Sequence, residues 1–189
     1  MELKEALYQR RSVRQYTQEV VSRETIEELL DAAVQAPSAT NSQPWAFAVL
    51  RGAEALEKHS TAARAFLLPH ISDDHPLSKY KAALANPKFN IFYGTGTLVL
   101  IFAKPNNIHG FGDCCLAAQN LMLAAHEKGL GSCWIGFASY YLNQPEQKAA
   151  FGIPADYELV APIILGYPAL PSAAIAKKPA EIIAWKELD

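Results

Sequence analysis

The chain has 189 residues, of which 50% are hydrophobic and 19% charged, and 17 Lys and Arg nearly balance 19 Asp and Glu. This composition is typical of one globular domain and argues against a surface made for nucleic acid or an anionic membrane. The three cysteines form no disulfide framework, and neither a secretory leader nor an apolar run of about 18 residues is apparent. We therefore expect a soluble cytoplasmic protein with no nucleic-acid or membrane partner.

The predicted elements begin with a short helix over residues 3–8, followed by an extended basic segment. A second helix is capped by Ser22 and ends before Pro37. It is amphipathic, because apolar side chains recur at helical spacing at Ile26, Leu29, Leu30, Ala33 and Val34.

In the middle of the chain, stretches with a clear secondary-structure pattern alternate with stretches that have none. A polar loop leads into a strand over residues 45–50, and residues 53–67 are predicted to be helical. Residues 69–90, rich in Pro, Asp, Lys and His, show no clear pattern beyond a short helix over 77–84. We expect this stretch to be a mobile excursion from the domain.

The continuous apolar run over residues 97–103 predicts a strand buried on both faces. Asp113 is predicted to cap a helix that ends at Gly129. This helix is apolar on every side, so we expect it to be buried all round, in the core or in a subunit interface.

The remaining elements are a strand at SCWI, a helix over 144–151 and a strand over 158–165. Asn143 is the expected cap of that helix, and an extended tail follows the last strand. We find no internal repeat, linker or low-complexity block. The sequence therefore predicts one α+β domain over residues 1–189.

Three guanidinium groups and a hydroxyl occur within five residues, at Arg10, Arg11, Ser12 and Arg14. Arginine donors match the oxygens of phosphate or carboxylate, and a serine hydroxyl adds a further bond. A solvated charged turn would explain the same residues.

Two further segments could bind a flat, amide-rich ligand. The loop SATNSQP offers neutral donors and acceptors at Ser38, Asn41 and Gln43. The stretch GLGSCWIG has three glycines that would let the backbone approach a ring closely. A turn bonded to its own backbone and a helix end followed by a strand are the structural alternatives.

Several sharper motifs are absent or incomplete. The chain has no phosphate-binding P-loop, no dinucleotide fingerprint opening a helix, no nucleophile elbow and no second histidine for a zinc helix. The cluster His70, Asp73, Asp74 and His75 has no recognised ligand spacing, so we expect no metal. Cys133 has no evident histidine partner and is typical of a small buried hydrophobe.

Four segments in this order, ALYQRRSVRQY, QAPSATNSQPW, LAAQNLMLAAHEKGLGSCWIG and ILGYPA with KKPAEIIAW, resemble the nitroreductase family of FMN-dependent oxidoreductases. The resemblance covers essentially the whole chain. It implies a central mixed β-sheet flanked by helices, in an intertwined homodimer with FMN at the subunit interface. It implies cofactor-binding residues at Arg10, Arg11, Ser12, Arg14, Ser38, Asn41, Gln43, Ile135, Gly136, Lys177 and Lys178.

By motif position, Arg10, Ser12 and Lys177 fall toward the phosphate and Arg14 toward the pyrimidine edge. Ile135 and Gly136 would present backbone amides to flavin N5 and O4. The chain departs from the family pattern in having Ala39 instead of a serine, Ile135 where some members have Glu, and Lys177 instead of Arg. Because lysine cannot form a bidentate fork, we expect phosphate binding to be looser.

The activity implied by the resemblance is hydride transfer from NAD(P)H through flavin N5 to nitroaromatics, quinones or similar electrophiles. No catalytic acid, base or nucleophile is evident, as expected when the cofactor carries the reaction. Tyr80, Phe89 and Phe92 are the expected substrate-cavity residues. The alternatives are a flavin-binding sensor or carrier without efficient turnover, and a thiol enzyme centred on Cys133.

Overall fold

The structure is a computed structural model that describes residues 1–173 and 175–188. Four strands form one sheet in the order β1-β2-β4-β3, and every neighbouring pair is antiparallel. The strands are β1 (Trp45–Arg51), β2 (Thr97–Ala103), β3 (Gly131–Trp134) and β4 (Glu158–Gly166). The α+β class is confirmed. An isolated bridge between Ser12 and Ser132 is parallel. In the described part of the chain, it is this bridge alone that makes the sheet mixed.

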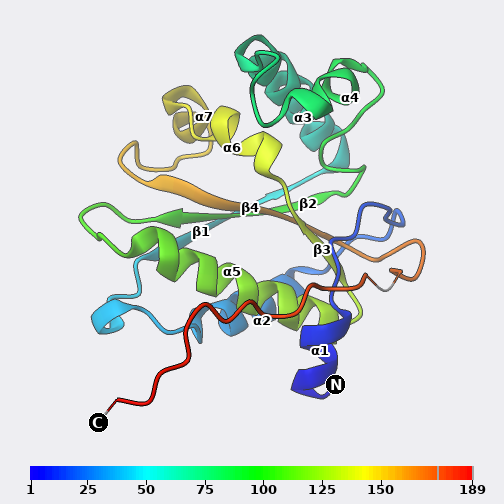
Figure 1. Cartoon of the computed structure of the whole chain (residues 1–189). Helices are drawn as coiled ribbons and strands as arrows, with labels where there is room; N and C mark the ends of the chain where they lie inside the picture. Colours follow the sequence, from blue (N-terminus) through cyan, green and yellow to red (C-terminus); the bar gives the residue numbers. More distant parts are fainter. Residues whose placement is uncertain (174, 189) are drawn as a thin grey trace.

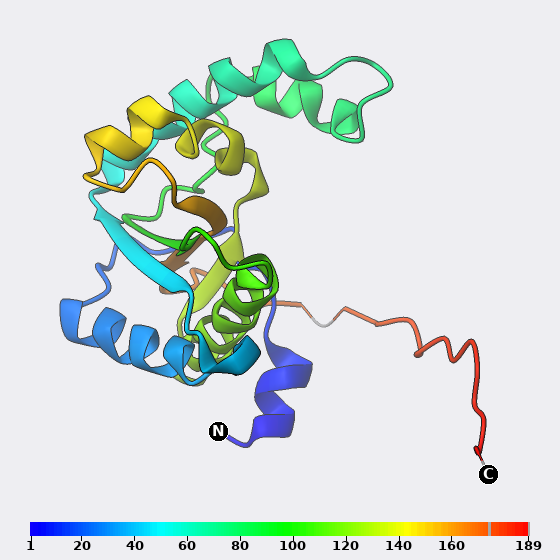
Figure 2. The same cartoon turned by 90° about the vertical axis from the view of Figure 1, so that its left-hand side faces the viewer.

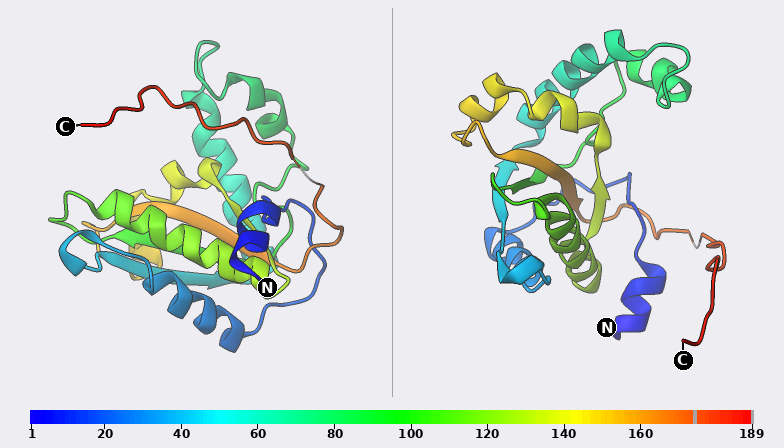
Figure 3. Two further views of the ribbon diagram at one scale, coloured as in Figure 1. Left: turned by 60° about the horizontal axis from the view of Figure 1, so that its bottom comes forward. Right: turned by 60° about the vertical axis from the view of Figure 1, so that its left-hand side comes forward.

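Helices cover both faces of this sheet (Figure 1). One face carries α1 (Leu3–Gln9), α2 (Arg23–Val34) and α5 (Gly110–Glu127). The other face carries α3 (Ala53–Leu67), α4 (Lys81–Ala85), α6 (Gly136–Leu142) and α7 (Pro145–Ala150). Two other views show the same three-layer arrangement (Figure 3).

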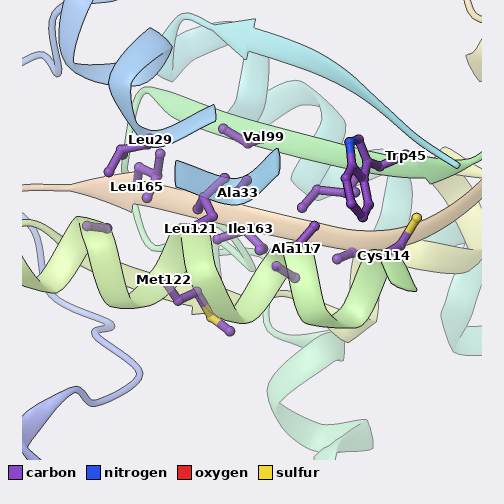
Figure 4. Close-up of a cluster of buried hydrophobic side chains, with 14 of the residues drawn as sticks. Leu29, Ala33, Trp45, Val99, Cys114, Ala117, Leu121, Met122, Ile163 and Leu165 are labelled. Carbon is purple, nitrogen blue, oxygen red and sulfur yellow. The ribbon is translucent and has the colours of Figure 1, made fainter. Parts of the chain in front are cut away.

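The central strand β2 is buried along its whole length, as its uninterrupted apolar sequence predicts. It separates two apolar cores, one beneath α2 and α5 and one beneath α3 and α6. In the first core, Leu29 from α2 and Leu121 from α5 meet Val99 and Ile163 of the sheet (Figure 4). Ser22 caps α2 as expected, since its Oγ accepts from the Thr25 N–H at 3.1 Å.

Two predicted helix caps are wrong, and for the same reason. α5 begins at Gly110, and the Asp113 carboxylate accepts from the Ala39 N–H at 3.2 and 3.3 Å. Asn143 follows α6, and its side-chain oxygen accepts from the Leu159 N–H at 3.2 Å. Both side chains bond backbone that is distant in sequence, so each joins two segments instead of closing its own helix.

The helix α5 is buried on one side and open on the other. Its inner face packs on the sheet, but Phe111 is 62% exposed and Leu116 is 46% exposed. The expected all-round burial is therefore not achieved within one chain.

The tail, described over residues 170–173 and 175–188, is extended as expected and leads away from the body (Figure 2). Several large apolar side chains of the tail are exposed, including Leu170, Ile175, Ile183 and Trp185. Among the described residues, we find no helix with the length and apolar character needed to cross a membrane.

His59 on α3 packs among aromatic rings, 5.2 Å from the Phe151 centroid and 6.2 Å from that of Tyr141. Burial lowers the pKa of His59. The unfolded chain therefore takes up a proton at higher pH, near 6.5, than the folded protein does. We expect the free energy of unfolding to decrease as pH falls below about 6.5 toward the lower folded pKa, and His59→Gln to weaken this dependence.

Urea unfolding at several pH values between 7.5 and 5 measures this dependence. His109→Gln, at an exposed histidine, is the matched control. Equal acid sensitivity in wild type and His59→Gln would contradict the prediction.

Candidate functional site

The basic segment, residues 10–15, runs along the outer edge of β3. The Val13 N–H donates to the Ser132 carbonyl at 3.0 Å. Gly131 permits this approach, because a Cβ at that position would lie only 2.7 Å from the Val13 Cβ. Tyr16 adds a second fixed point, since its hydroxyl donates to the Val13 carbonyl at 2.7 Å. Gly131 of the GLGSCWIG stretch thus lets the basic segment pack closely on β3, and this packing holds the arginines against the sheet.

The three arginines have different surroundings. Arg11 Nη1 donates to the carbonyls of Tyr8 at 2.7 Å and Arg10 at 2.8 Å, so Arg11 closes the end of α1. Arg14 lines a cavity of about 710 Å³, within the range typical of small-molecule sites. Arg10 and Arg11 line a second cavity of about 610 Å³.

The first cavity brings together Arg14, Ile135, Gly136, Tyr80 and Phe89, which are far apart in sequence. Its floor comes from the end of β3 and the start of α6. Half of its lining comes from residues 75–93, which we call the outer wall. Several other lining residues were not expected at a ligand cavity from the sequence, namely His75, Leu77, Tyr93, Phe137 and Tyr140. A cavity so rich in aromatic side chains suits a flat ligand.

Phe92 does not line this cavity. Its side chain is 0% exposed and belongs to the core beneath α3 and α6. The expectation for Phe92 is therefore wrong. The neighbouring Tyr93 is the residue that reaches the cavity instead.

Tyr93 is held in the left-handed region at φ 55°, a rare conformation for an aromatic residue. Its N–H donates to the Asn90 carbonyl at 2.9 Å, which closes the turn before β2. Burial raises the pKa of the Tyr93 phenol, partly opposed by the charge and hydrogen bonding of Arg14. The site thus holds a protonated phenol beside a guanidinium. In the sequence, Tyr93 followed by Gly94 before an apolar strand was the signal that could have indicated this turn.

The two backbone amides expected at the ligand differ in availability. The Ile135 N–H donates to the Pro162 carbonyl at 2.8 Å. Gly136 is the first residue of α6, so its N–H has no acceptor within that helix. Apart from its chain neighbours and the backbone of its own helix, no atom of the described residues lies within 4 Å of the position a Gly136 Cβ would take. Of this pair, the Gly136 amide is the one left for a ligand.

The second cavity is basic. Arg10, Arg11 and His126 all line it, and the pKa of His126 is lowered by burial and then by the charge of Arg10. Among the described residues, neither Arg11 Nε nor His126 Nε2 has a hydrogen-bond partner, although both are buried. Ser12 and Arg14 line a smaller adjoining cavity of about 280 Å³. Unpaired nitrogens beside arginines suit an anionic ligand.

The polar loop with Ser38, Asn41 and Gln43 lies at the opposite end of the sheet. It leads into Trp45, which pairs with Ala103, whereas β3 begins opposite Gly166. Ser38 Oγ accepts from the Gln43 N–H at 3.0 Å, and Gln43 Nε2 donates to Asn41 Oδ1 at 3.2 Å. Within one chain the side chains of Ser38, Asn41 and Gln43 thus bond within the loop, and the loop lines neither of the two cavities.

Three residues of this loop are left-handed, with φ 53° at Thr40, 55° at Asn41 and 46° at Gln43. A β-branched residue such as Thr40 in this region is strained. Strain of this kind is concentrated at functional sites.

Lys177 and Lys178 are exposed in the tail and are not among the residues that line the described cavities. They therefore share no described cavity with Arg10. Their expected role at a phosphate therefore depends on an assembly larger than one chain.

Cys133 lines the first cavity but is only 3% exposed. Burial raises the pKa of its thiol, and the nearby Arg14 charge opposes this only in part. A thiol that remains protonated is a poor nucleophile, which speaks against a thiol enzyme centred on Cys133.

The profile of the nitroreductase family matches residues 7–167. A protein of Methanothermobacter thermautotrophicus, named as a candidate NADH dehydrogenase/NAD(P)H nitroreductase, is 35% identical over 171 residues, covering 89% of this chain and 78% of that protein. The 5,6-dimethylbenzimidazole synthase of Rhodospirillum rubrum is 29% identical over 183 residues, covering 87% of this chain and 81% of the synthase.

Solved structures show the same fold. A nitroreductase of Bacteroides fragilis with bound FMN is 25% identical, with a TM-score of 0.79 and full coverage of both chains. A nitroreductase of Desulfitobacterium hafniense, also with bound FMN, is 21% identical, with a TM-score of 0.81 and 97% coverage of each chain. The latter likeness shows the fold alone.

Proposed function

The chain belongs to the nitroreductase family, and on that premise we propose that it is an FMN-dependent enzyme that takes hydride from NAD(P)H and passes it to nitroaromatics, quinones or related electrophiles. The observation that carries this proposal is the meeting of Arg14, the Gly136 amide and an aromatic wall in one cavity, beside a second, basic cavity. The small third cavity shares Arg14 with the first cavity and Arg11 with the second, so the basic segment connects a surface for a flat ring with a surface for an anion.

The residues fit FMN on chemical grounds. The phosphate carries about two negative charges, and the basic cavity offers Arg10 together with buried nitrogens that lack partners among the described residues. The open space above Gly136 lets a ring approach its N–H closely. Arg10 and Ser12 would hold the phosphate, and Arg14 and Gly136 would hold the ring.

Bound FMN would supply the two-electron chemistry that the side chains of this cavity lack. Arg14 would stabilise negative charge at the pyrimidine edge of the ring, which favours the reduced cofactor. The Tyr93 hydroxyl, kept protonated by burial, would donate a hydrogen bond to an oxygen in the same cavity. The aromatic lining would exclude water from the reacting atoms.

A homodimer completes this proposal. The exposed face of α5 and the apolar tail need a partner, because large contiguous apolar patches are uncommon on monomers. A second copy would cover them, and it would bring its own polar loop and tail lysines toward the site of the first. This arrangement would account for the distance between Ser38 and the cavities within one chain.

The alternative of a flavin-binding carrier requires no space for an acceptor. A cavity of about 710 Å³ is large enough for a ring and a second small molecule, and it favours the enzyme.

The test is the visible spectrum of the purified protein, followed by addition of NADH or NADPH without oxygen. We expect flavin bands near about 370 and 450 nm that bleach on addition. A colourless protein that fails to take up FMN would refute the proposal. Bound flavin that never bleaches would favour the carrier.

A further inference from the structure

The outer wall is attached to α3 by two buried polar side chains one helical turn apart. Ser60 is 1% exposed and Arg64 is 6% exposed. Ser60 Oγ accepts from the Ile91 N–H at 2.9 Å. Both side chains lie on the face of α3 that meets the wall, as expected for positions i and i+4.

Arg64 makes the larger attachment. Its Nη1 donates to the carbonyls of Leu84 at 3.0 Å and Asn86 at 2.6 Å, and its Nη2 donates to the Pro87 carbonyl at 3.3 Å. In the described part of the chain, no carboxylate lies within ion-pair distance of this guanidinium. A buried charge that meets only carbonyls depends on their geometry, so it fixes the backbone that supplies them.

The attached backbone lies between the residues that face the cavity. Tyr80 and Ala83 precede the three carbonyls, and Phe89 and Tyr93 follow them. The ion pair between Lys81 of the wall and Asp73, which precedes the wall, has a distance of 3.2 Å; it is exposed and contributes little. The buried contacts to Ser60 and Arg64 are therefore suited to fix the distance from wall to floor.

We propose that Ser60 and Arg64 form a clamp that sets the width of the cavity and so determines which acceptors fit. This inference rests on the proposed function, because it assigns the selectivity of that same cavity. Arg64 is here a positioning residue, since its own side chain does not line the cavity. The clamp keeps the aromatic wall close enough to the floor to grip a narrow ring.

The test compares Arg64→Met and Ser60→Ala with wild type on two quinones, a single-ring benzoquinone and a wider naphthoquinone. We expect Arg64→Met to raise the ratio of kcat/KM for the wide over the narrow quinone by about tenfold, the discrimination that small changes in an apolar pocket produce. KM for the narrow quinone should rise while kcat changes less. Ser60→Ala should shift the ratio in the same direction by a smaller factor.

Lys148→Met is the matched control. Lys148 is also buried, at 7% exposed, and its Nζ donates to the carbonyls of Ala155 at 2.6 Å and Tyr157 at 3.1 Å. Lys148 does not line the cavity, so its loss should leave the quinone ratio unchanged even if stability falls.

Hydrogen exchange supplies a readout that is independent of turnover. Amides of residues 80–93 should exchange faster in Arg64→Met, while those of β2 and α5 keep the wild-type rate. If Arg64→Met does not fold, Arg64→Lys and Ser60→Ala test the same attachment. An unchanged quinone ratio in folded clamp variants, or the same change in Lys148→Met, would overturn the clamp. Wild-type protein that bound no flavin would refute the proposed function instead, and hydrogen exchange would still measure the attachment.

Discussion

Gly131→Ala should destabilise the protein by about 2 kcal/mol, because the added methyl group must push apart two packed segments. The new Cβ would lie 2.7–2.9 Å from three atoms of Val13. Relief requires the basic segment to leave the edge of β3, and Arg10 and Arg14 move with it. We therefore also expect FMN affinity to fall by about tenfold, equivalent to one charge-assisted hydrogen bond.

Urea unfolding and FMN titration of the apoprotein measure the two effects. Gly96→Ala is the control, because its added Cβ would lie 3.5 Å from the Ala53 backbone nitrogen, an ordinary van der Waals contact. Wild-type stability and FMN affinity in Gly131→Ala would show that the basic segment is not fixed by this packing.

Leu116→Glu should convert the proposed dimer to a monomer. Leu116 lies on the open face of α5, and a charge buried there without a partner weakens association strongly. We expect the dimer dissociation constant to rise by at least about thirtyfold, as for a central interface residue. If the partner contributes to the cofactor site, FMN is lost together with the dimer.

Light scattering at several protein concentrations, with the flavin absorbance recorded on the same samples, tests this prediction. Ala149→Glu adds the same charge at an exposed position on the far side of the sheet and should change neither quantity. An unchanged mass for Leu116→Glu would exclude this face of α5 from the interface.

Elements set by local pattern could be predicted from the sequence. The helix over residues 53–67 and the strand over 97–103 have the predicted bounds, because periodic or continuous apolar sequence decides them. The helix α6 was missed, because its sequence GFASYYL begins with glycine and is rich in aromatic residues, which favour strands. The caps assigned to Asp113 and Asn143 failed because their partners are distant in sequence.

The candidate site could be predicted only in part. Arg14, Ile135 and Gly136, which the motifs singled out, line one cavity, and each is close to a strand or helix that the sequence pattern indicates. The sequence could not show whether Phe92 or Tyr93 faces the cavity, because this depends on the backbone conformation of the strained turn before β2. It also could not show that the Ile135 N–H is already bonded to Pro162, a contact between the residue that follows β3 and strand β4.

The burial of Cys133 would have a chemical consequence if the proposed quinone and nitro substrates enter the first cavity. Quinones and partly reduced nitro compounds are electrophiles, and a thiolate beside them would be arylated. Cys133 lies in the cavity through which they would pass, yet its thiol is almost fully covered and its raised pKa keeps it protonated. Under the proposed function, this burial would protect the site from inactivation by its own substrates, although a cysteine lines the cavity.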